Sequence, residues 1–322
     1  MKAPGFKRWF ARLPSLNVPQ RLQVLDALRP ALGLAQVVAL IDTIRAQNRR
    51  CPGCACPHWR RHGMANDLQR YRCRQCGRTY NDLSGTPLAR LRLRGKWLDY
   101  LDTLLASRPV RGAANGVGVH RNTAFRWRHR FLQGVRHDRP ARLTGIVEAD
   151  EMFLLESQKG ARKLDRPARR RGGVARLRGI SRELDCILVA RDRSGQTTGA
   201  VTGRGPLTAP QVQQHLLAVL DPQALLVTDS QPAYRAFARR HGIAHQAVNL
   251  RQGVRVRSGV AGAIHVQNVN SYHRRFREWI ARFHGVASRY LPNYLGWHRA
   301  LDGGRIASAD QLLRKVFGPI NS

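Results

Sequence analysis

Two aspartates lie within or directly after apolar stretches that have the composition of core strands. Asp150 stands in GIVEADEMFLL, residues 145–155, and Asp229 ends QALLVTD, residues 223–229. A carboxylate is costly to bury in such a strand unless it has a partner. If the two strands are neighbours, their carboxylates can hold Mg²⁺ ions about 3.5–4 Å apart, which is what two-metal phosphodiester cleavage requires.

Each aspartate also has a purely structural interpretation. Asp150 would then form an ion pair with a nearby arginine, and Asp229 would cap the helix that follows Ser230. Glu148 shares a strand face with Asp150 and would support it from behind, whereas Glu151 faces the other way because side chains alternate along a strand.

A third ligand is expected at the start of a helix in IHVQNVNSYHRRFREWI, residues 264–280. Apolar residues recur there at helical spacing, at Tyr272, Phe276, Trp279, Ile280 and Phe283. Asn270, Arg274 and Arg277 lie on the opposite, basic side. The only acid between Asp229 and the end of this helix is Glu278, about 12 Å further along the axis, too far to join the same cluster. Asn270 is therefore the better third ligand, although its carbonyl brings one negative charge fewer than a carboxylate.

Four cysteines have the spacing of a structural zinc site. CPGC holds Cys51 and Cys54, and CRQC holds Cys73 and Cys76, with eighteen residues between the pairs. Each CxxC turn brings two thiolates to one ion, and two turns complete a tetrahedron. Because a ribbon this small buries little surface, Zn²⁺ would contribute its folding free energy. Other candidate ligands nearby are Cys56, His58 and His62.

Residues 110–132, VRGAANGVGVHRNTAFRWRHRFL, predict a helix-turn-helix. Gly118 lies in the turn, the second helix begins near His120, and Phe125 and Trp127 would anchor it. Other small helix pairs have similar patterns, so the motif alone is moderate evidence. The polar face of the second helix carries residue types that contact bases and phosphates, namely Arg121, Asn122, Arg126, Arg128 and Arg130.

The composition indicates a globular protein with a polyanionic partner. The chain has 322 residues, a hydrophobic fraction of 43% and a formal net charge of +36. So large an excess of cations favours nucleic acid as the partner. No apolar run reaches the roughly 18 residues of a membrane span, so no membrane association is expected. The paired cysteines favour a reducing compartment, the cytoplasm.

The order of patterns predicts a multidomain α+β protein. Residues 16–46 read as two short helices broken near Pro30. From residue 145 the pattern changes to three strands, a helix, a fourth strand and further helices at 231–242 and 269–284. The expected segments are an N-terminal helical segment (1–46), a zinc ribbon (47–82), a helix-turn-helix region (83–138) and a mixed α/β domain (143–322).

With these residues in view, the chain resembles the zinc-ribbon transposases of bacterial and archaeal insertion sequences, the insertion-sequence family fifteen-ninety-five in particular. The resemblance covers nearly the whole chain. It rests on CPGC, CRQC, AFRWRHRFL, EADEMFLLES, RRRGG, VTDSQPAY and, most specifically, HVQNVNSYHRRFREWIARFHGVASRYLPNYLGW.

The resemblance implies an RNase H-like catalytic domain with a DDE-type triad and Mg²⁺, for which Mn²⁺ can substitute. Asp150 and Asp229 match the two aspartates, Asn270 falls at the usual glutamate, and Arg277 is the basic residue seven positions later. The implied reaction is hydrolysis of a phosphodiester at a transposon end, followed by attack of the freed 3′-hydroxyl on target DNA. Arg274 is expected to contact this DNA. The basic segment 161–182 is either a clamp on the DNA backbone or a disordered loop.

Two other functions stay open at this point. A catalytically inactive relative would bind specific DNA as a repressor of transposition or transcription, and Asn270 favours it. Another RNase H-like nuclease, such as a resolvase, would not need the N-terminal ribbon and helix-turn-helix. For a transposase we expect double-stranded DNA as partner, a homodimer or larger assembly on it, and a location at the nucleoid in the cytoplasm.

Overall fold

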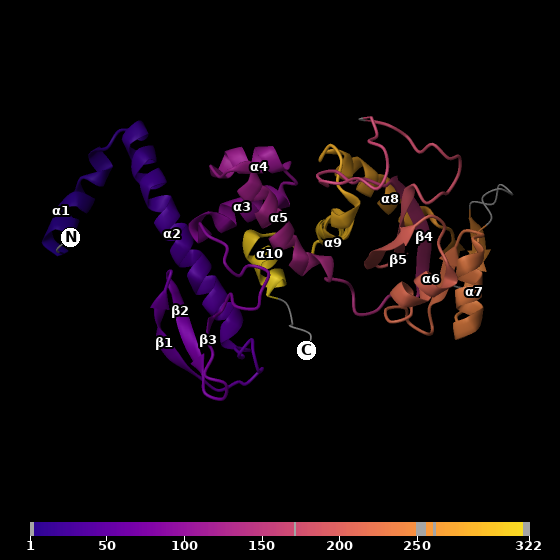
Figure 1. The fold of residues 1–322 in the computed structure, drawn as a ribbon, viewed down its shortest axis with the longest axis horizontal. Helices are drawn as coiled ribbons and strands as arrows, with labels where there is room; N and C mark the ends of the chain where they lie inside the picture. Colours follow the sequence, from indigo (N-terminus) through magenta and orange to yellow (C-terminus); the bar gives the residue numbers. More distant parts are fainter. Residues whose placement is uncertain (1–2, 171, 249–255, 260–261, 318–322) are drawn as a thin grey trace. The chain divides into compact units, whose positions relative to one another are not determined.

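The computed structural model describes residues 3–170, 172–248, 256–259 and 262–317, and the chain divides into two compact units (Figure 1). One unit comprises residues 1–127 and 308–322, and the other comprises residues 128–307. The division differs from the predicted segments in two places. It falls inside a helix, and it assigns residues from 308 onward to the N-terminal unit.

The N-terminal unit begins with α1 (Ala3–Ala11), a 3₁₀ turn (Leu13–Ser15) and the long helix α2 (Val18–Ala46). A capping box starts α2, because Asn17 and Gln20 each accept the backbone N–H of the other at 3.0 Å. The expectation of two helices broken near Pro30 is wrong, since α2 is continuous through that position. A proline usually kinks a helix interior, and this rule misled the prediction.

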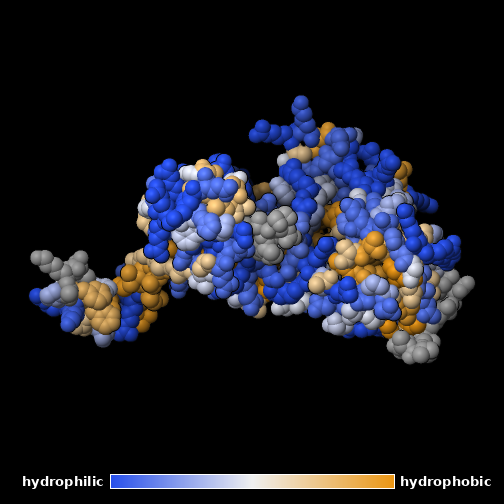
Figure 2. All heavy atoms as spheres, turned by 90° about the horizontal axis from the view of Figure 1, so that it is seen from below, coloured by the Kyte–Doolittle hydropathy of each residue, from blue (hydrophilic) through white to orange (hydrophobic). Residues whose placement is uncertain are grey.

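The helix α2 also corrects the expectation that no segment has the length and composition of a membrane span. It has 29 residues, and its most apolar part is long enough to cross a membrane and is mostly not buried. Figure 2 shows hydrophobic residues gathered over these N-terminal helices, at the left of the view. The core helix of a soluble protein and a signal sequence can have the same length and composition, so these two properties alone decide nothing about a membrane.

The segment with the paired cysteines forms a three-stranded antiparallel sheet of β1 (Trp59–Ala65), β2 (Leu68–Cys73) and β3 (Thr79–Asn81). Tyr71 and Tyr80 are buried beside the cysteines. Arg49, just after α2, forms two hydrogen bonds with buried Asp82, at 2.8 and 3.0 Å, and stacks over Tyr71. The buried ion pair between Arg49 and Asp82 therefore connects the ribbon to the end of α2.

Helices follow the ribbon: a 3₁₀ turn (Arg94–Lys96), α3 (Trp97–Leu105), α4 (Val110–Val117) and α5 (Arg121–Arg136). Gly118 ends α4 with a left-handed φ of 65°, which glycine adopts at little cost. The C-terminal helix α10 (Ala309–Val316) packs on α3. The two helices and the turn expected at residues 110–132 are thus present.

The second unit is built on a five-stranded sheet in the order β6-β5-β4-β7-β8. Its strands are β4 (Ile146–Leu155), β5 (Leu184–Asp192), β6 (Thr197–Arg204), β7 (Leu225–Thr228) and β8 (His245–Ala247). The strand β5 runs antiparallel to both of its neighbours, β4 and β6, whereas β7 runs parallel to β4 and to β8. A two-stranded hairpin of β9 (Arg257–Gly259) and β10 (Gly262–Ile264) precedes α8.

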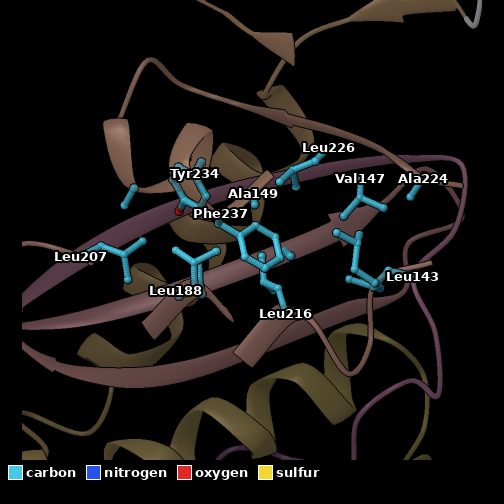
Figure 3. Close-up of a cluster of buried hydrophobic side chains, with 14 of the residues drawn as sticks. Leu143, Val147, Ala149, Leu188, Leu207, Leu216, Ala224, Leu226, Tyr234 and Phe237 are labelled. Carbon is cyan, nitrogen blue, oxygen red and sulfur yellow. The ribbon is translucent and has the colours of Figure 1, made fainter. Parts of the chain in front are cut away.

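Helices cover both faces of this sheet. On one face, α6 (Ala209–Leu216) and α7 (Pro232–His241) enclose a core that includes Val147, Ala149 and Phe237 (Figure 3). On the other face, α8 (Gln267–Ala281) contacts β4 and β5, and α9 (Leu291–Asp302) contacts β6. The predicted mixed α/β order is confirmed. Alternate side chains of the central strand β4 face the two layers of helices.

Candidate active site

The strands β4 and β7 place the two predicted aspartates side by side. Ala149 of β4 pairs with Thr228 of β7 in parallel register, and the next residues along the two strands are Asp150 and Asp229. Buried hydrophobic residues precede both, so burial of the strands fixes the positions of the carboxylates. The prediction that adjacent core strands bring Asp150 and Asp229 together agrees with this geometry.

A third carboxylate joins them. Ligand oxygens of Asp150, Glu151 and Asp229 all lie within 4.8 Å of one another. Glu151 does leave β4 on the opposite face from Asp150, since its Oε2 accepts a hydrogen bond from Tyr234 of α7 at 2.9 Å. Because the cluster lies where β7 has ended, a side chain from that face still reaches it. The expectation that Glu151 turns away from the site was therefore misleading.

The electrostatics of the cluster reflect its burial. Burial, then Glu151 and Asp229, raise the pKa of Asp150 to about 7, while Arg277 acts in the opposite direction. Burial also raises the pKa of Glu151, and the Tyr234 hydroxyl opposes that rise. Three acids held this close disfavour their own ionised forms unless a cation joins them.

Asp229 lies just before α7 but, contrary to the structural interpretation, does not cap it. One oxygen, Oδ1, accepts the backbone N–H of Gln231 at 3.0 Å. The N-cap is Gln231 itself, whose side chain accepts the N–H of Ala233 at 2.6 Å. Since a carboxylate has a second oxygen, the contact of Asp229 with Gln231 is compatible with a place in the acidic cluster.

The partner of Asp150 is a histidine rather than an arginine. Among the described residues, His273 of α8 is the basic residue in contact with Asp150, with its Nδ1 3.7 Å from Asp150 Oδ2. His273 is buried, and burial followed by the charge of Arg277 lowers its pKa to about 3. It is a neutral imidazole beside the carboxylate. Sequence analysis missed it, although it lies one helical turn after Asn270.

Glu148 fixes the start of α8. Its fully buried carboxylate accepts the backbone N–H groups of Asn268 and Val269, at 2.7 and 3.0 Å, and the Asn268 side-chain amide at 2.9 Å. Arg193 and His265 each lie 3.3 Å from its Oε1. A carboxylate at a helix N-terminus satisfies free N–H groups and complements the helix dipole. The predicted supporting role of Glu148 thus acts on the helix that carries Asn270.

The helix α8 presents the remaining predicted residues at its surface. Tyr272 and Phe276 are fully buried, as the apolar stripe predicts, whereas Asn270, Arg274 and Arg277 are exposed. The charge of Arg277 acts on Asp150, so it lies on the side of the acidic cluster. Glu278 is exposed and forms an ion pair with Arg274 at 3.8 Å.

The zinc-ribbon cysteines converge as their spacing predicts. Their four sulfurs lie within 4.8 Å of one another, with Sγ–Sγ distances of 3.5 Å for Cys51 and Cys76 and 3.6 Å for Cys54 and Cys73. Four thiolates around Zn²⁺ with Zn–S bonds of about 2.3 Å have sulfurs about 3.8 Å apart, so the cluster fits the ion. Cys56 is outside this group, and its sulfur accepts the N–H of His58 at 3.4 Å.

The second helix of the helix-turn-helix, α5, exposes most of its predicted DNA contacts. Arg121, Asn122, Arg126 and Arg130 are exposed. Arg128 is not available to DNA, because it is fully buried against Phe283 and Trp297 and donates a 3.3 Å hydrogen bond to Tyr294. Phe125 is also 41% exposed, so Trp127, which is 2% exposed, is the aromatic anchor of this helix. Helical spacing alone did not separate the buried arginine from the exposed ones.

The basic segment between β4 and β5 is held by two glutamates. Buried Glu156 pairs with Arg166 at 2.8 Å, Arg169 at 3.2 Å and Arg204 at 3.1 Å. Glu183 pairs with Arg169 and accepts backbone N–H groups of Arg176 and Leu177. The described part of this segment therefore has internal ion pairs, while its role toward DNA stays a prediction.

Comparison with known proteins relates this chain to transposases. Residues 142–297 match the ISXO2-like transposase domain. The chain is 29% identical over 283 residues to an uncharacterized protein in transposable element ISH50 of Halobacterium salinarum, covering 86% of this chain and 90% of the relative. The structure of a pre-cleavage Mos1 transpososome matches with a TM-score of 0.21 and 15% identity, over 64% of this chain and 79% of that one. A likeness that low carries no argument.

The matched domain spans β4, β7 and α8, so it contains Asp150, Asp229 and Asn270 together. The ISH50 relative extends the similarity beyond this domain to most of the chain. Residues 142–297 are thus an ISXO2-like transposase domain, and the two comparisons support a transposase of insertion-sequence family fifteen-ninety-five.

Proposed function

We propose that this transposase binds the ends of its insertion sequence and catalyses metal-dependent strand cleavage and strand transfer into target DNA. The observation that carries the proposal is the meeting of Asp150 and Asp229 on adjacent parallel strands of a domain that matches a transposase family. A central strand with one aspartate beside a parallel strand ending on another supports an RNase H-like catalytic domain.

The residues present fit divalent metal ions. The acidic cluster offers the carboxylate oxygens that Mg²⁺ and Mn²⁺ prefer, and its mutual repulsion favours a bound cation. Asp150 and Asp229 would hold the ions, and the Asn270 carbonyl would add a neutral ligand. Bound there, the ions would supply Lewis-acid activation of water and stabilisation of the leaving oxygen. Arg277 would bind the scissile phosphate, since it is exposed on the same side of α8.

The N-terminal unit would recognise DNA. Zn²⁺ would fold the ribbon around Cys51, Cys54, Cys73 and Cys76, and the exposed face of α5 would enter the major groove with Arg121, Asn122 and Arg126. In the second unit, Arg274 of α8 would add a phosphate contact. Because joining needs two transposon ends, we expect a homodimer or larger assembly on double-stranded DNA, acting at the nucleoid of a bacterial or archaeal cell.

A catalytically inactive DNA-binding relative is the second candidate. Asn270 favours it, because an amide at this position removes a negative charge from the metal site. Such a protein would bind the ends and repress transposition or transcription.

The test is cleavage and joining of the DNA that flanks the gene, in Mg²⁺ and in Mn²⁺. We expect the wild type to cut and join, and Asn270→Ala to cut at least about tenfold more slowly, as losses around metal sites typically do. Glu278→Ala, on the same helix, should match the wild type. If the wild type binds the ends without cutting and Asn270→Glu gains cutting, the inactive relative is the correct description.

A further inference from the structure

We propose that Glu151 supplies the third carboxylate of the metal site and thereby replaces the negative charge that Asn270 lacks. This inference rests on the proposed function, because it assigns an additional ligand to the same site. The three carboxylates have ligand oxygens within 4.8 Å of one another. Metal–oxygen bonds of about 2.0–2.6 Å place ligands of one ion at most about 4–5 Å apart, so the three oxygens can share an ion.

Glu151 is held in this position from the layer of α6 and α7. Tyr234 of α7 is fully buried, and its hydroxyl donates a 2.9 Å hydrogen bond to Glu151 Oε2. A glutamate has one more methylene group than an aspartate, and this length lets Glu151 reach the cluster from the face opposite to Asp150. The neighbouring positions on β4 therefore approach one site from two sides of the sheet.

The charges around the site favour this assignment. Asp150 and Asp229 bring two negative charges, and Asn270 brings none. Glu278, the acid on α8, is exposed and paired with Arg274. With Glu151 the site has three carboxylates to hold two divalent ions. A glutamate in place of Asn270 would have given the same number of negative charges.

A second feature points to a ligand at the cluster. His273 is only 4% exposed, and its Nδ1 faces Asp150 Oδ2 at 3.7 Å. Among the described residues its Nε2 has no hydrogen-bond partner. A buried imidazole that lies beside Asp150 and has one unpaired nitrogen is expected where a bound group, rather than protein alone, completes the site. It comes from α8, independently of the strands that carry the acids.

The experiment is a Mn²⁺ titration of the full, zinc-loaded chain, followed by the electron paramagnetic resonance signal of free Mn²⁺. We expect Glu151→Gln to raise the dissociation constant on the order of tenfold or more, as Asp229→Asn does. Glu278→Gln, which changes the same group outside the cluster, should stay within about threefold of the wild type. Wild-type affinity in Glu151→Gln together with weak binding in Asp229→Asn would overturn the inference and leave the proposed function intact.

If the wild type does not bind Mn²⁺, or if Asp229→Asn binds like the wild type, the metal site itself is wrong and both proposals fail. Tyr234→Phe distinguishes the effect of the Glu151 charge from the effect of its hydrogen bond, because this variant removes the hydrogen bond and keeps the carboxylate. It should bind Mn²⁺ within about threefold of the wild type. If Tyr234→Phe and Glu151→Gln lose Mn²⁺ affinity equally, the affinity depends on the hydrogen bond between β4 and α7 and not on the carboxylate. That result would also overturn the inference.

Discussion

At the scale of single residues, burial decides which polar groups are ionised and which are available to a partner. Arg128 and Arg126 are two positions apart on α5, yet one is enclosed by aromatic rings and the other is exposed. The sequence pattern placed both on the polar face. His298 shows the same effect on a titratable group, since it lies among Tyr272, Phe276 and Trp279 with ring centroids 5.0–5.2 Å away.

His298 should make the protein sensitive to acid. Burial lowers its pKa to about 4, below the value of about 6.5 for an unfolded chain. Between these values the unfolded chain binds a proton that the folded protein does not, so stability present above pH 6.5 is lost as the pH falls toward 4. The difference corresponds to about 3 kcal/mol. His298→Phe keeps an aromatic ring and should remove most of this loss.

The measurement is urea unfolding of the wild type and His298→Phe at pH 7 and at pH 4.5, with the two proteins compared at each pH. Other acid-sensitive sites, including the zinc ribbon, are common to both proteins. An equal loss of unfolding free energy in the two proteins on acidification would contradict the assignment.

At the scale of elements, the strands β4 and β7 and the helix α8 form the candidate site, and Glu148 connects them. It comes from β4, two positions before Asp150, and caps the helix that carries Asn270 and Arg277. One side chain thus connects the central strand β4 to the start of α8. Any change at Glu148 should move the helix relative to the aspartates.

Glu148→Gln tests this connection. The amide accepts weaker hydrogen bonds than the carboxylate and leaves Arg193 without its ion pair, so we expect a loss of about 2 kcal/mol in unfolding free energy. End-DNA cleavage should fall even at temperatures where the variant is fully folded, because Asn270 and Arg277 shift. Glu278→Gln, at the exposed end of the same helix, serves as the control. Full cleavage by folded Glu148→Gln would refute the positioning role.

Much of this element order was predictable from sequence. The strands at residues 145–155 and 223–229 and the helix at 269–284 follow from hydrophobic patterns, and the positions of Asp150 and Asp229 follow from those strands. The cap by Glu148, the contact of His273 and the approach of Glu151 were not predictable, because they depend on which face of β4 each helix covers. The prediction missed the continuity of α2 through Pro30 because it applied the local rule that a proline breaks a helix. The C-terminal part of α2 is buried, and that packing was not visible to the rule.

At the scale of the whole molecule, a strongly cationic chain combines a small sheet that carries four clustered cysteines with a larger sheet-based unit. The net charge of +36 is spread over both units and supports binding to polyanionic DNA. The transposase domain match lies in the second unit, whereas the four clustered cysteines lie in the first. The two units should therefore respond differently to the loss of zinc.

Removal of zinc should unfold the ribbon and spare the sheet of the second unit. Cys51→Ser should lose the bound zinc and the protection of residues 51–81 in hydrogen exchange, because the ion contributes the folding free energy of this small sheet. Cys56→Ser, a buried neighbour outside the cluster, should retain zinc. Wild-type protection of the ribbon after chelation would contradict a structural role for the metal.

The central claim is that Asp150 and Asp229 form a metal-dependent centre for DNA strand cleavage. Its most direct test is the single-turnover cleavage rate of transposon-end DNA, with and without Mg²⁺, for the wild type and Asp229→Ala at equal DNA occupancy. The account predicts that the wild type cleaves only with Mg²⁺ or Mn²⁺ and that Asp229→Ala is slower by about a thousandfold or more, the scale of losing a central electrostatic group. Equal rates for the two proteins, or specific binding by the wild type without cleavage in either metal, would contradict it.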